Sequence, residues 1–321
     1  METPCGDFAW PHLPYNHLIM KCFRHKPHNV ESIEKHLRIH VDRLAGLIGP
    51  RYLKKPKSIQ ASIGYIENQW NSMGYEISHE SYDAMGDQAT NLIVELPGSK
   101  RPDEIILVGS HYDTVFSTPG ADDNASAVAV MLEVSRILKE TDNKRTIRFV
   151  AFTCEEPPYF NLDCMGSQHH ARESKRRNDQ IMGMLCLEMV GYYTTEPNSQ
   201  NIPPLIPKLL RGFFPKRGNF LAAVGNLASW KLCWQFRRGF KKGSPDMPLF
   251  SICLPERINE IRMSDNSSFW DQNYPALMLT DTSFLRNPNY HRSTDTPETL
   301  DYPRMTQVTC GIASAVQLLA N

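Results

Sequence analysis

The sequence has no net charge. Its 321 residues include 35 lysines and arginines and 35 aspartates and glutamates, so basic and acidic groups balance at pH 7. Proteins that bind nucleic acid or anionic membranes by electrostatic attraction carry an excess of basic charge. We therefore expect neither a nucleic-acid partner nor a membrane partner.

Long hydrophobic runs are also missing. A helix that spans a bilayer needs roughly 20 apolar residues, and the longest candidate, residues 125–134, is interrupted by Ser126 and Glu133. The N-terminus (METPCGDFAW) has no basic start followed by an apolar core, so it does not predict a signal peptide. We therefore expect a protein of the cytoplasm.

The eight cysteines form no CxxC pair. A zinc cage built from cysteines usually needs such pairs, so we do not expect this kind of structural metal site. Several cysteines lie within apolar, strand-like runs, which is typical of buried free thiols in a reducing compartment.

The order of secondary-structure signals predicts an α/β protein. Residues 1–27 have no periodicity and read as an irregular extension, and residues 28–321 are expected to form a single domain. Helices are predicted where apolar residues recur at helical spacing, at residues 29–47, 58–72, 124–140 and 305–320. Strands are predicted at residues 75–79, 89–96, 104–109, 146–153, 182–190, 220–224, 249–253 and 276–280. Alternation of this kind favours a mostly parallel or mixed central sheet with helices on both faces.

Histidines and carboxylates follow the ends of the predicted strands. In open α/β sheets, ligands bind beyond the carboxyl ends of the strands. The residues at these positions are His111 and Asp113, Asp122 and Asp123, Glu155 and Glu156, Glu188, and His291. Each one alone has a structural explanation: Asp123, for example, could cap a helix. Their convergence on one sheet edge predicts a functional site.

These side chains predict a metal centre. Several carboxylates and imidazoles in one cleft resist burial unless a cation neutralises them. Zinc accepts this mixture of nitrogen and oxygen ligands in catalytic sites, and cobalt or manganese could replace it. One metal usually needs three protein ligands, so five candidates indicate two metals that share a carboxylate, about 3.5–4 Å apart.

Five motifs in order give the sequence a family resemblance. HYD, GADDNASA, CEEPP, LEMVG and YHRSTDTPE resemble the motifs of the co-catalytic dizinc aminopeptidases, a family that includes glutaminyl cyclases and glutamate-carboxypeptidase-type enzymes. The likeness covers roughly residues 60–320 and implies a zinc-exopeptidase architecture acting on peptides. It implies that His111, Asp123 and Glu188 bind one zinc ion, and that Asp123, Glu156 and His291 bind the other. Some relatives have Asp in place of Glu188, and secreted or periplasmic relatives are common.

The resemblance also implies roles for residues around the metals. Glu155 is expected to act as the general base that activates a water molecule. Asp113 lies two residues after His111 on a strand, so it can reach the His111 ring and fix its tautomer. Asp295 is expected to do the same for His291. The bond between Asp123 and Asn124 is expected to be cis, as it often is in the family.

The substrate pocket is expected in the loops that flank the last strand. Aromatic and polar residues there suggest a preference for a hydrophobic or aromatic first residue; they are Asp265, Asn266, Phe269, Trp270, Phe284 and Tyr290. In contrast, we interpret His169 and His170 as surface residues of a helix.

Three other activities compete with the aminopeptidase prediction. A glutaminyl-peptide cyclotransferase uses the same scaffold, and a receptor-like relative would have lost its metals. A carboxypeptidase would need basic groups to hold a free carboxylate, and Arg262, Arg286 and Arg292 are near enough in sequence to keep that alternative open. The oligomeric state is not predicted.

Overall fold

A computed structural model of the chain describes residues 30–321, so the extension expected at residues 1–27 lies outside the described residues. Eight strands form one continuous sheet. Their bounds are β1 Ser78–Ala84, β2 Asp87–Leu96, β3 Arg101–His111, β4 Arg145–Phe152, β5 Gln180–Glu188, β6 Leu221–Asn226, β7 Leu249–Leu254 and β8 Ala276–Thr280.

Seven α-helices accompany the sheet in the described part of the chain. They are α1 Val30–Val41, α2 Pro56–Ser72, α3 Ala127–Leu138, α4 Gly166–Arg176, α5 Trp230–Gly243, α6 Asn266–Trp270 and α7 Tyr302–Leu319. A π-helical turn, Asp42–Ile48, continues α1, and another, Ala121–Ser126, leads into α3. None of the helices in residues 30–321 is both long and apolar enough to cross a membrane.

The centre of the sheet is parallel. The strand order is β1-β2-β4-β3-β5-β8-β6-β7, and the neighbouring strands β4, β3, β5 and β8 all run in the same direction. The pairs β1–β2, β2–β4 and β6–β8 are antiparallel. The predicted mixed sheet is confirmed, and four strands end at the same edge.

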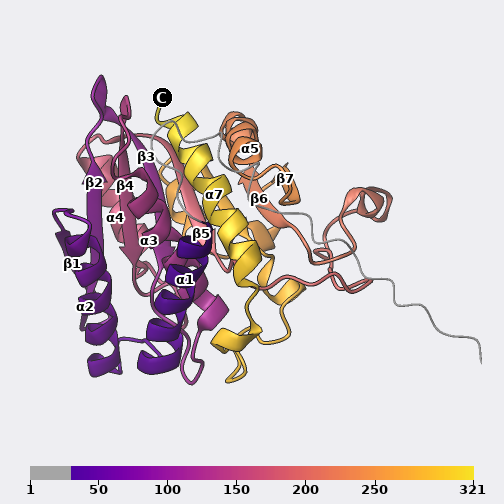
Figure 1. Ribbon diagram of the computed structural model, residues 1–321, viewed down its shortest axis with the longest axis horizontal. Coiled ribbons are helices and arrows are strands. Elements are labelled where there is room, and N and C mark those ends of the chain that lie inside the picture. Colours follow the sequence, from indigo (N-terminus) through magenta and orange to yellow (C-terminus); the bar gives the residue numbers. More distant parts are fainter. Residues whose placement is uncertain (1–29) are drawn as a thin grey trace, which may run out of the picture.

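Helices cover both faces of the sheet, as predicted. Alternate residues of β3 show this, because Ile106 and Val108 face one hydrophobic core while Ile105 and Leu107 face the other. The first core also receives side chains from α1, α2, α3, α5 and α7, and the second from α4 and α6. In Figure 1, α1, α3 and α7 lie together over one face.

Two local predictions differ from the structure. The first strand begins at Ser78 rather than at residue 75, because Tyr75 is buried and its hydroxyl donates a hydrogen bond of 2.8 Å to the carbonyl oxygen of Ser135 in α3. Helix α5 is not among the predicted helices. Its Gly239 allows close packing on α7, since a Cβ atom there would lie 2.5 Å from the Cα atom of Ala315.

Candidate metal centre

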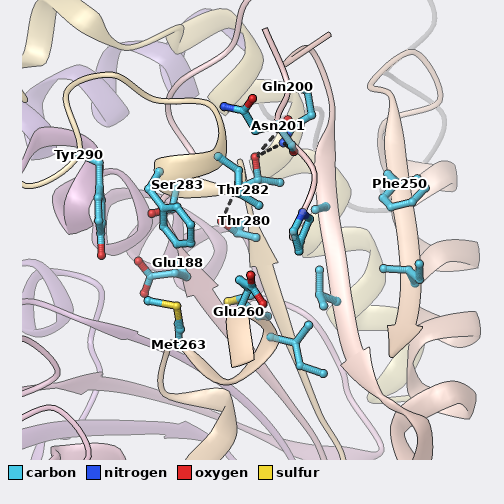
Figure 2. Close-up of a pocket in the computed structure, with 18 of the residues that line it drawn as sticks. Glu188, Gln200, Asn201, Phe250, Glu260, Met263, Thr280, Thr282, Ser283 and Tyr290 are labelled. Atoms are coloured by element: carbon cyan, nitrogen blue, oxygen red, sulfur yellow. Dashed lines mark hydrogen bonds between the residues drawn. The ribbon is translucent and has the colours of Figure 1, made fainter. Parts of the chain in front are cut away.

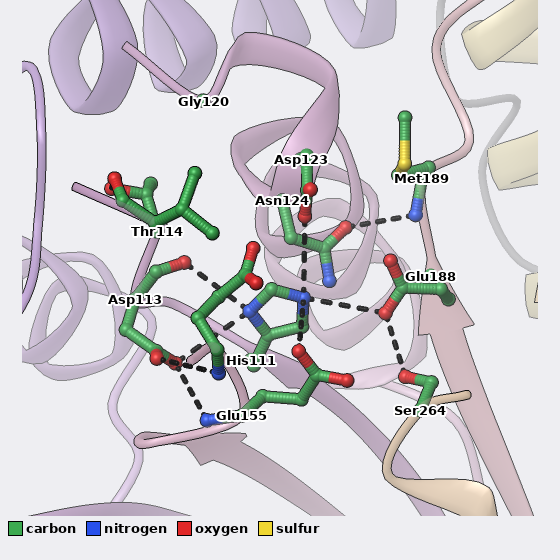
Figure 3. A network of polar contacts seen from close by, with 12 residues as sticks. His111, Asp113, Thr114, Gly120, Asp123, Asn124, Glu155, Glu188, Met189 and Ser264 are labelled. Carbon is green, nitrogen blue, oxygen red and sulfur yellow. Dashed lines mark hydrogen bonds and ion pairs between the residues drawn. The ribbon is translucent and has the colours of Figure 1, made fainter. Parts of the chain in front are cut away.

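The ends of the parallel strands position most of the expected ligands. His111 is the last residue of β3 and Glu188 is the last residue of β5. Glu155 and Glu156 follow β4, whose Phe152 is paired with His111 across the sheet. Because these strands are parallel neighbours, their terminal side chains meet at one edge. Figure 3 shows His111, Glu155 and Glu188 converging there.

Asp123 comes from the π-helical turn before α3. Its bond to Asn124 is cis, as predicted. The Asn124 side chain ties this turn to the end of β5: Nδ2 donates to the carbonyl oxygen of Leu187 at 3.1 Å, and Oδ1 accepts from the backbone N–H of Met189 at 2.9 Å. The turn is therefore fixed beside Glu188.

The two carboxylate oxygens of Asp123 face two different histidines. Oδ1 lies 3.5 Å from Nε2 of His111, and Oδ2 lies 3.2 Å from Nε2 of His291. Each histidine nitrogen also has a second carboxylate nearby. Glu188 Oε2 lies 3.3 Å from Nε2 of His111, and Glu156 Oε2 lies 3.3 Å from Nε2 of His291. The structure therefore brings the five expected ligands together around Asp123.

The unpaired atoms of the cluster fit a bound cation. His111 Nε2, Asp123 Oδ2 and Glu156 Oε1 are buried and have no hydrogen-bond partner in the described part of the chain. Polar atoms so placed are costly unless something else binds them. The donors are imidazole nitrogens and carboxylate oxygens, which is the set that catalytic zinc sites use.

Charge crowding also points to a cation. Burial, followed by the charge of Asp123, raises the pKa of Glu156 to about 8. Burial opposes protonation of His291, but the adjacent carboxylates of Asp123 and Glu156 outweigh it and raise the pKa of His291 to about 10. Both shifts reflect negative charge that the protein side chains alone do not balance.

Glu155 lies at the same side of the cluster as Glu188. Its Oε2 is 3.8 Å from Nε2 of His111. Within the described residues, ligand atoms of His111, Glu155 and Glu188 come within 4.8 Å of one another, as do those of His111, Asp123 and Glu156. Geometry alone therefore makes Glu155 a candidate ligand as well as a candidate base. Burial raises the pKa of its carboxyl group well above the usual range, and the charges of Glu188 and Glu156 add to this effect.

Asp113 contacts both the histidine and the glutamates, in a different way from the one predicted. Nδ1 of His111 lies 3.2 Å from the backbone carbonyl oxygen of Asp113. The Asp113 carboxylate is farther from this nitrogen, with Oδ1 at 3.6 Å. The carboxylate instead accepts the backbone N–H groups of Glu155 at 3.3 Å and Glu156 at 3.2 Å. One residue thus orients the His111 ring and holds the loop after β4.

The structure does not place Asp295 on the His291 ring. The Asp295 carboxylate accepts the backbone N–H groups of Asp122 at 2.9 Å and Asp123 at 3.1 Å. The His291 ring stacks on the ring of Tyr290, with 3.7 Å between centroids. The prediction that Asp295 orients the His291 ring is wrong. Its carboxylate instead accepts two backbone N–H groups of the turn before α3.

The prediction that His170 is a surface residue is also wrong. His170 is fully buried, and its Nδ1 lies 2.9 Å from Glu80 Oε2. Helix α4 packs over the sheet at this point, so His170 faces inward. His169 is partly buried and stacks on the Tyr82 ring.

A pocket opens beside the cluster. Its volume is about 910 Å³ when the open mouth is included. Of the residues predicted to line it, Phe284 and Tyr290 do so. The others are buried elsewhere in the fold and do not line it; they are Asp265, Asn266, Phe269 and Trp270. Figure 2 shows Glu188 and Tyr290 together with Glu260 and Met263 around this space.

Glu260 and Ser264 also belong to the site and were not predicted from the sequence. Glu260 lines the pocket, and the Ser264 hydroxyl donates a hydrogen bond of 2.6 Å to Oε2 of Glu188. Both lie in a polar stretch without periodicity, between the predicted strands at residues 249–253 and 276–280. No local signal distinguishes them from ordinary loop residues.

Comparison with known proteins identifies the family. The sequence model of peptidase family M28 matches residues 91–316, and the chain belongs to this family. The chain is 35% identical over 291 residues to the uncharacterized protein YfbL of Escherichia coli (strain K12), covering 88% of this chain and 86% of that protein. It is 41% identical over 95 residues to aminopeptidase YwaD of Bacillus subtilis (strain 168), covering 29% of this chain and 19% of that protein. A probable zinc metalloprotease of Pyrenophora tritici-repentis is 37% identical over 159 residues, which is 46% of this chain and 36% of that protein.

Solved structures share the fold at low sequence identity. A zinc aminopeptidase from Bacillus subtilis, BSAP, superimposes with a TM-score of 0.70 at 15% identity, covering 88% of this chain and 94% of that chain. A glutaminyl cyclase from an Acidobacteriales bacterium gives a TM-score of 0.66 at 15% identity, covering 93% and 97%. These two neighbours establish the fold, and family membership makes the chain a zinc-dependent peptidase.

Proposed function

We propose that this chain is an aminopeptidase that removes the first residue of peptides at a centre of two zinc ions. One observation carries the proposal: Asp123 directs its two oxygens to two histidines, and each histidine has its own second carboxylate. This arrangement fits two metals that share one bridging carboxylate. His111 and Glu188 complete one set of ligands, and Glu156 and His291 complete the other.

Zinc held by these residues would supply Lewis acidity for the scissile carbonyl and for a water nucleophile. The protein supplies the proton transfers. The Glu155 carboxylate faces the cluster and takes a proton from the attacking water, and it then gives that proton to the leaving amine.

Asp113 holds Glu155 and Glu156 in place for these two tasks. Because its carboxylate accepts both backbone N–H groups, the peptide units of the loop cannot rotate independently. The Glu155 carboxylate lies 3.8 Å from Nε2 of His111, whereas the Glu156 carboxylate lies 3.3 Å from Nε2 of His291. One can therefore bind metal while the other meets the water.

The charge of the pocket favours a free amino group over a free carboxylate. Among the described residues that line it, five are carboxylates and none is lysine or arginine. Arg262 binds Asp271 at 2.6 Å, and Arg286 donates to Gln200 and to the carbonyl oxygen of Phe220. These arginines are held outside the pocket lining, so the lining offers no cation to hold a C-terminal carboxylate.

The first experiment measures metal content and hydrolysis together. Purified protein is analysed by mass spectrometry for zinc, and leucyl and phenylalanyl amide reporters are tested before and after chelation. About two zinc ions per chain and chelator-sensitive release of the amine are expected. If a glutaminyl peptide instead loses ammonia and cyclises with its peptide bonds intact, the protein is a cyclase. Zinc binding without either reaction would overturn both activities.

A further inference from the structure

The pocket beside the metal cluster has apolar walls that come mostly from the C-terminal half of the sheet. Phe220, Phe250, Ile252 and Met278 contribute from the segments around β6, β7 and β8, and Ile261 contributes from the single turn Asn259–Arg262. Walls of this kind pack against aliphatic or aromatic groups. By themselves they would favour an apolar side chain, in line with the preference predicted from the sequence.

One carboxylate interrupts these apolar walls. Glu260 lines the pocket, and its Oε2 atom is buried without a hydrogen-bond partner among the described residues. Figure 2 shows the Glu260 side chain among the other side chains of the pocket. Buried carboxylate oxygens are normally paired. An unpaired one that borders a cavity indicates that a partner arrives with the occupant.

The protein itself offers Glu260 no cation within the pocket. No lysine or arginine is among the described residues that line it. The nearest arginine along the chain, Arg262, is already bound by Glu256 and by Asp271. The other carboxylates of the lining are Glu155 and the candidate ligands Asp123, Glu156 and Glu188. Glu260 is thus the carboxylate of the pocket that the proposed metal centre leaves unused.

We propose that Glu260 makes this pocket selective for a first residue with a long basic side chain, lysine or arginine. This inference rests on the proposed aminopeptidase function. The methylene groups of lysine and arginine pack along apolar surface while their charged ends need an anionic partner. The apolar walls meet the first requirement and Glu260 meets the second. Acidic side chains are disfavoured, because they would face an uncompensated like charge.

The test compares lysine with norleucine, which has a similar aliphatic stem and no charge. The ratio of kcat/KM for lysyl amide to that for norleucyl amide is measured for the wild type, E260Q and E256Q. Glu256 is a matched control, because it is exposed and pairs with Arg262 outside the pocket lining. A hydrogen-bonded charge pair predicts a wild-type ratio of about 10 to 100. We expect this ratio to collapse towards 1 in E260Q and to persist in E256Q.

Two outcomes would overturn the proposal. One is a wild-type preference for leucyl or norleucyl amide over both lysyl and arginyl amide. The other is an equal loss for lysyl and norleucyl amide in E260Q, which would mean that Glu260 binds the α-amino group common to both or only supports the fold. Calorimetric binding of free L-lysine and L-norleucine to the zinc-loaded protein gives an independent readout. If no amide is hydrolysed, the aminopeptidase function fails, and the binding ratio still decides whether the pocket selects a basic side chain.

Discussion

The Ser264 hydroxyl donates a hydrogen bond of 2.6 Å to Oε2 of Glu188, so a loop far along the chain orients a candidate metal ligand at the end of β5. Ser264 is fully buried, and its oxygen also lies 3.3 Å from Cys186 Sγ. Partners of this kind fix the direction in which a ligand offers its lone pairs.

Removal of this hydroxyl should weaken metal binding. We expect S264A to lose about 10- to 100-fold in zinc affinity, the range found when a ligand's hydrogen-bond partner is removed. Competitive titration with a chromophoric chelator measures the effect. S72A is the matched control, because the Ser72 hydroxyl is exposed and bonds only within its own helix. Equal zinc affinity in S264A and the wild type would show that Glu188 needs no such support.

Substitution of the candidate base should separate catalysis from metal binding. In E155Q we expect kcat to fall by about 10²- to 10⁴-fold, the usual contribution of general acid–base catalysis, while about two zinc ions remain bound. E156Q should instead lose zinc. Metal analysis and kinetics on the same samples distinguish the two variants. Loss of a zinc ion in E155Q would identify Glu155 as a ligand rather than the base.

The Asp295 carboxylate should stabilise the turn that presents Asp123. D295A leaves two backbone N–H groups without their acceptor. Each unsatisfied buried donor costs about 1–3 kcal/mol, so we expect the free energy of unfolding of the metal-free protein to fall by about 2–6 kcal/mol. Urea denaturation measures it. A change below 1 kcal/mol would contradict this role, and D295N, which keeps one oxygen acceptor, should lose less.

Stability at acidic pH should depend on Glu133 in α3. Burial opposes its ionisation, but the His40 ring, whose Nε2 lies 3.7 Å from Glu133 Oε1, and hydrogen bonds from Arg136 outweigh this effect and lower the pKa of Glu133 to about 2, from an ordinary value of 4.5. A carboxyl group with a depressed folded-state pKa adds stability above its unfolded pKa and loses it as the pH falls through its folded pKa. The stabilisation should therefore be complete above about pH 5 and disappear towards pH 2.

The expected size is about 3 kcal/mol, since each pKa unit corresponds to about 1.4 kcal/mol. Chemical denaturation of the wild type and E133Q at several pH values between 5 and 2 measures this part. The difference between their free energies of unfolding should shrink between pH 5 and pH 2. A difference that does not change with pH would show that Glu133 acts only through packing.

Much of the fold could be predicted because the signals that encode it are local. The apolar run at residues 104–109 and the helical spacing at residues 305–320 depend only on neighbouring residues, and both elements are present. The start of β1 at Ser78 and the close packing of Gly239 on α7 could not be predicted. Each depends on a partner distant in sequence, Ser135 in the first case and Ala315 in the second.

The candidate site shows the same division. The sequence by itself determined which residue types stand at the strand ends, and hence that His111, Glu188 and their neighbours form a cluster in need of cations. Only the tertiary structure decided that Asp295 holds backbone N–H groups and that Glu260 lies unpaired in a pocket with apolar walls. The reason is physical: the periodicity of a strand fixes where its last side chain lies, whereas the partners of a side chain depend on how segments distant in the sequence pack together.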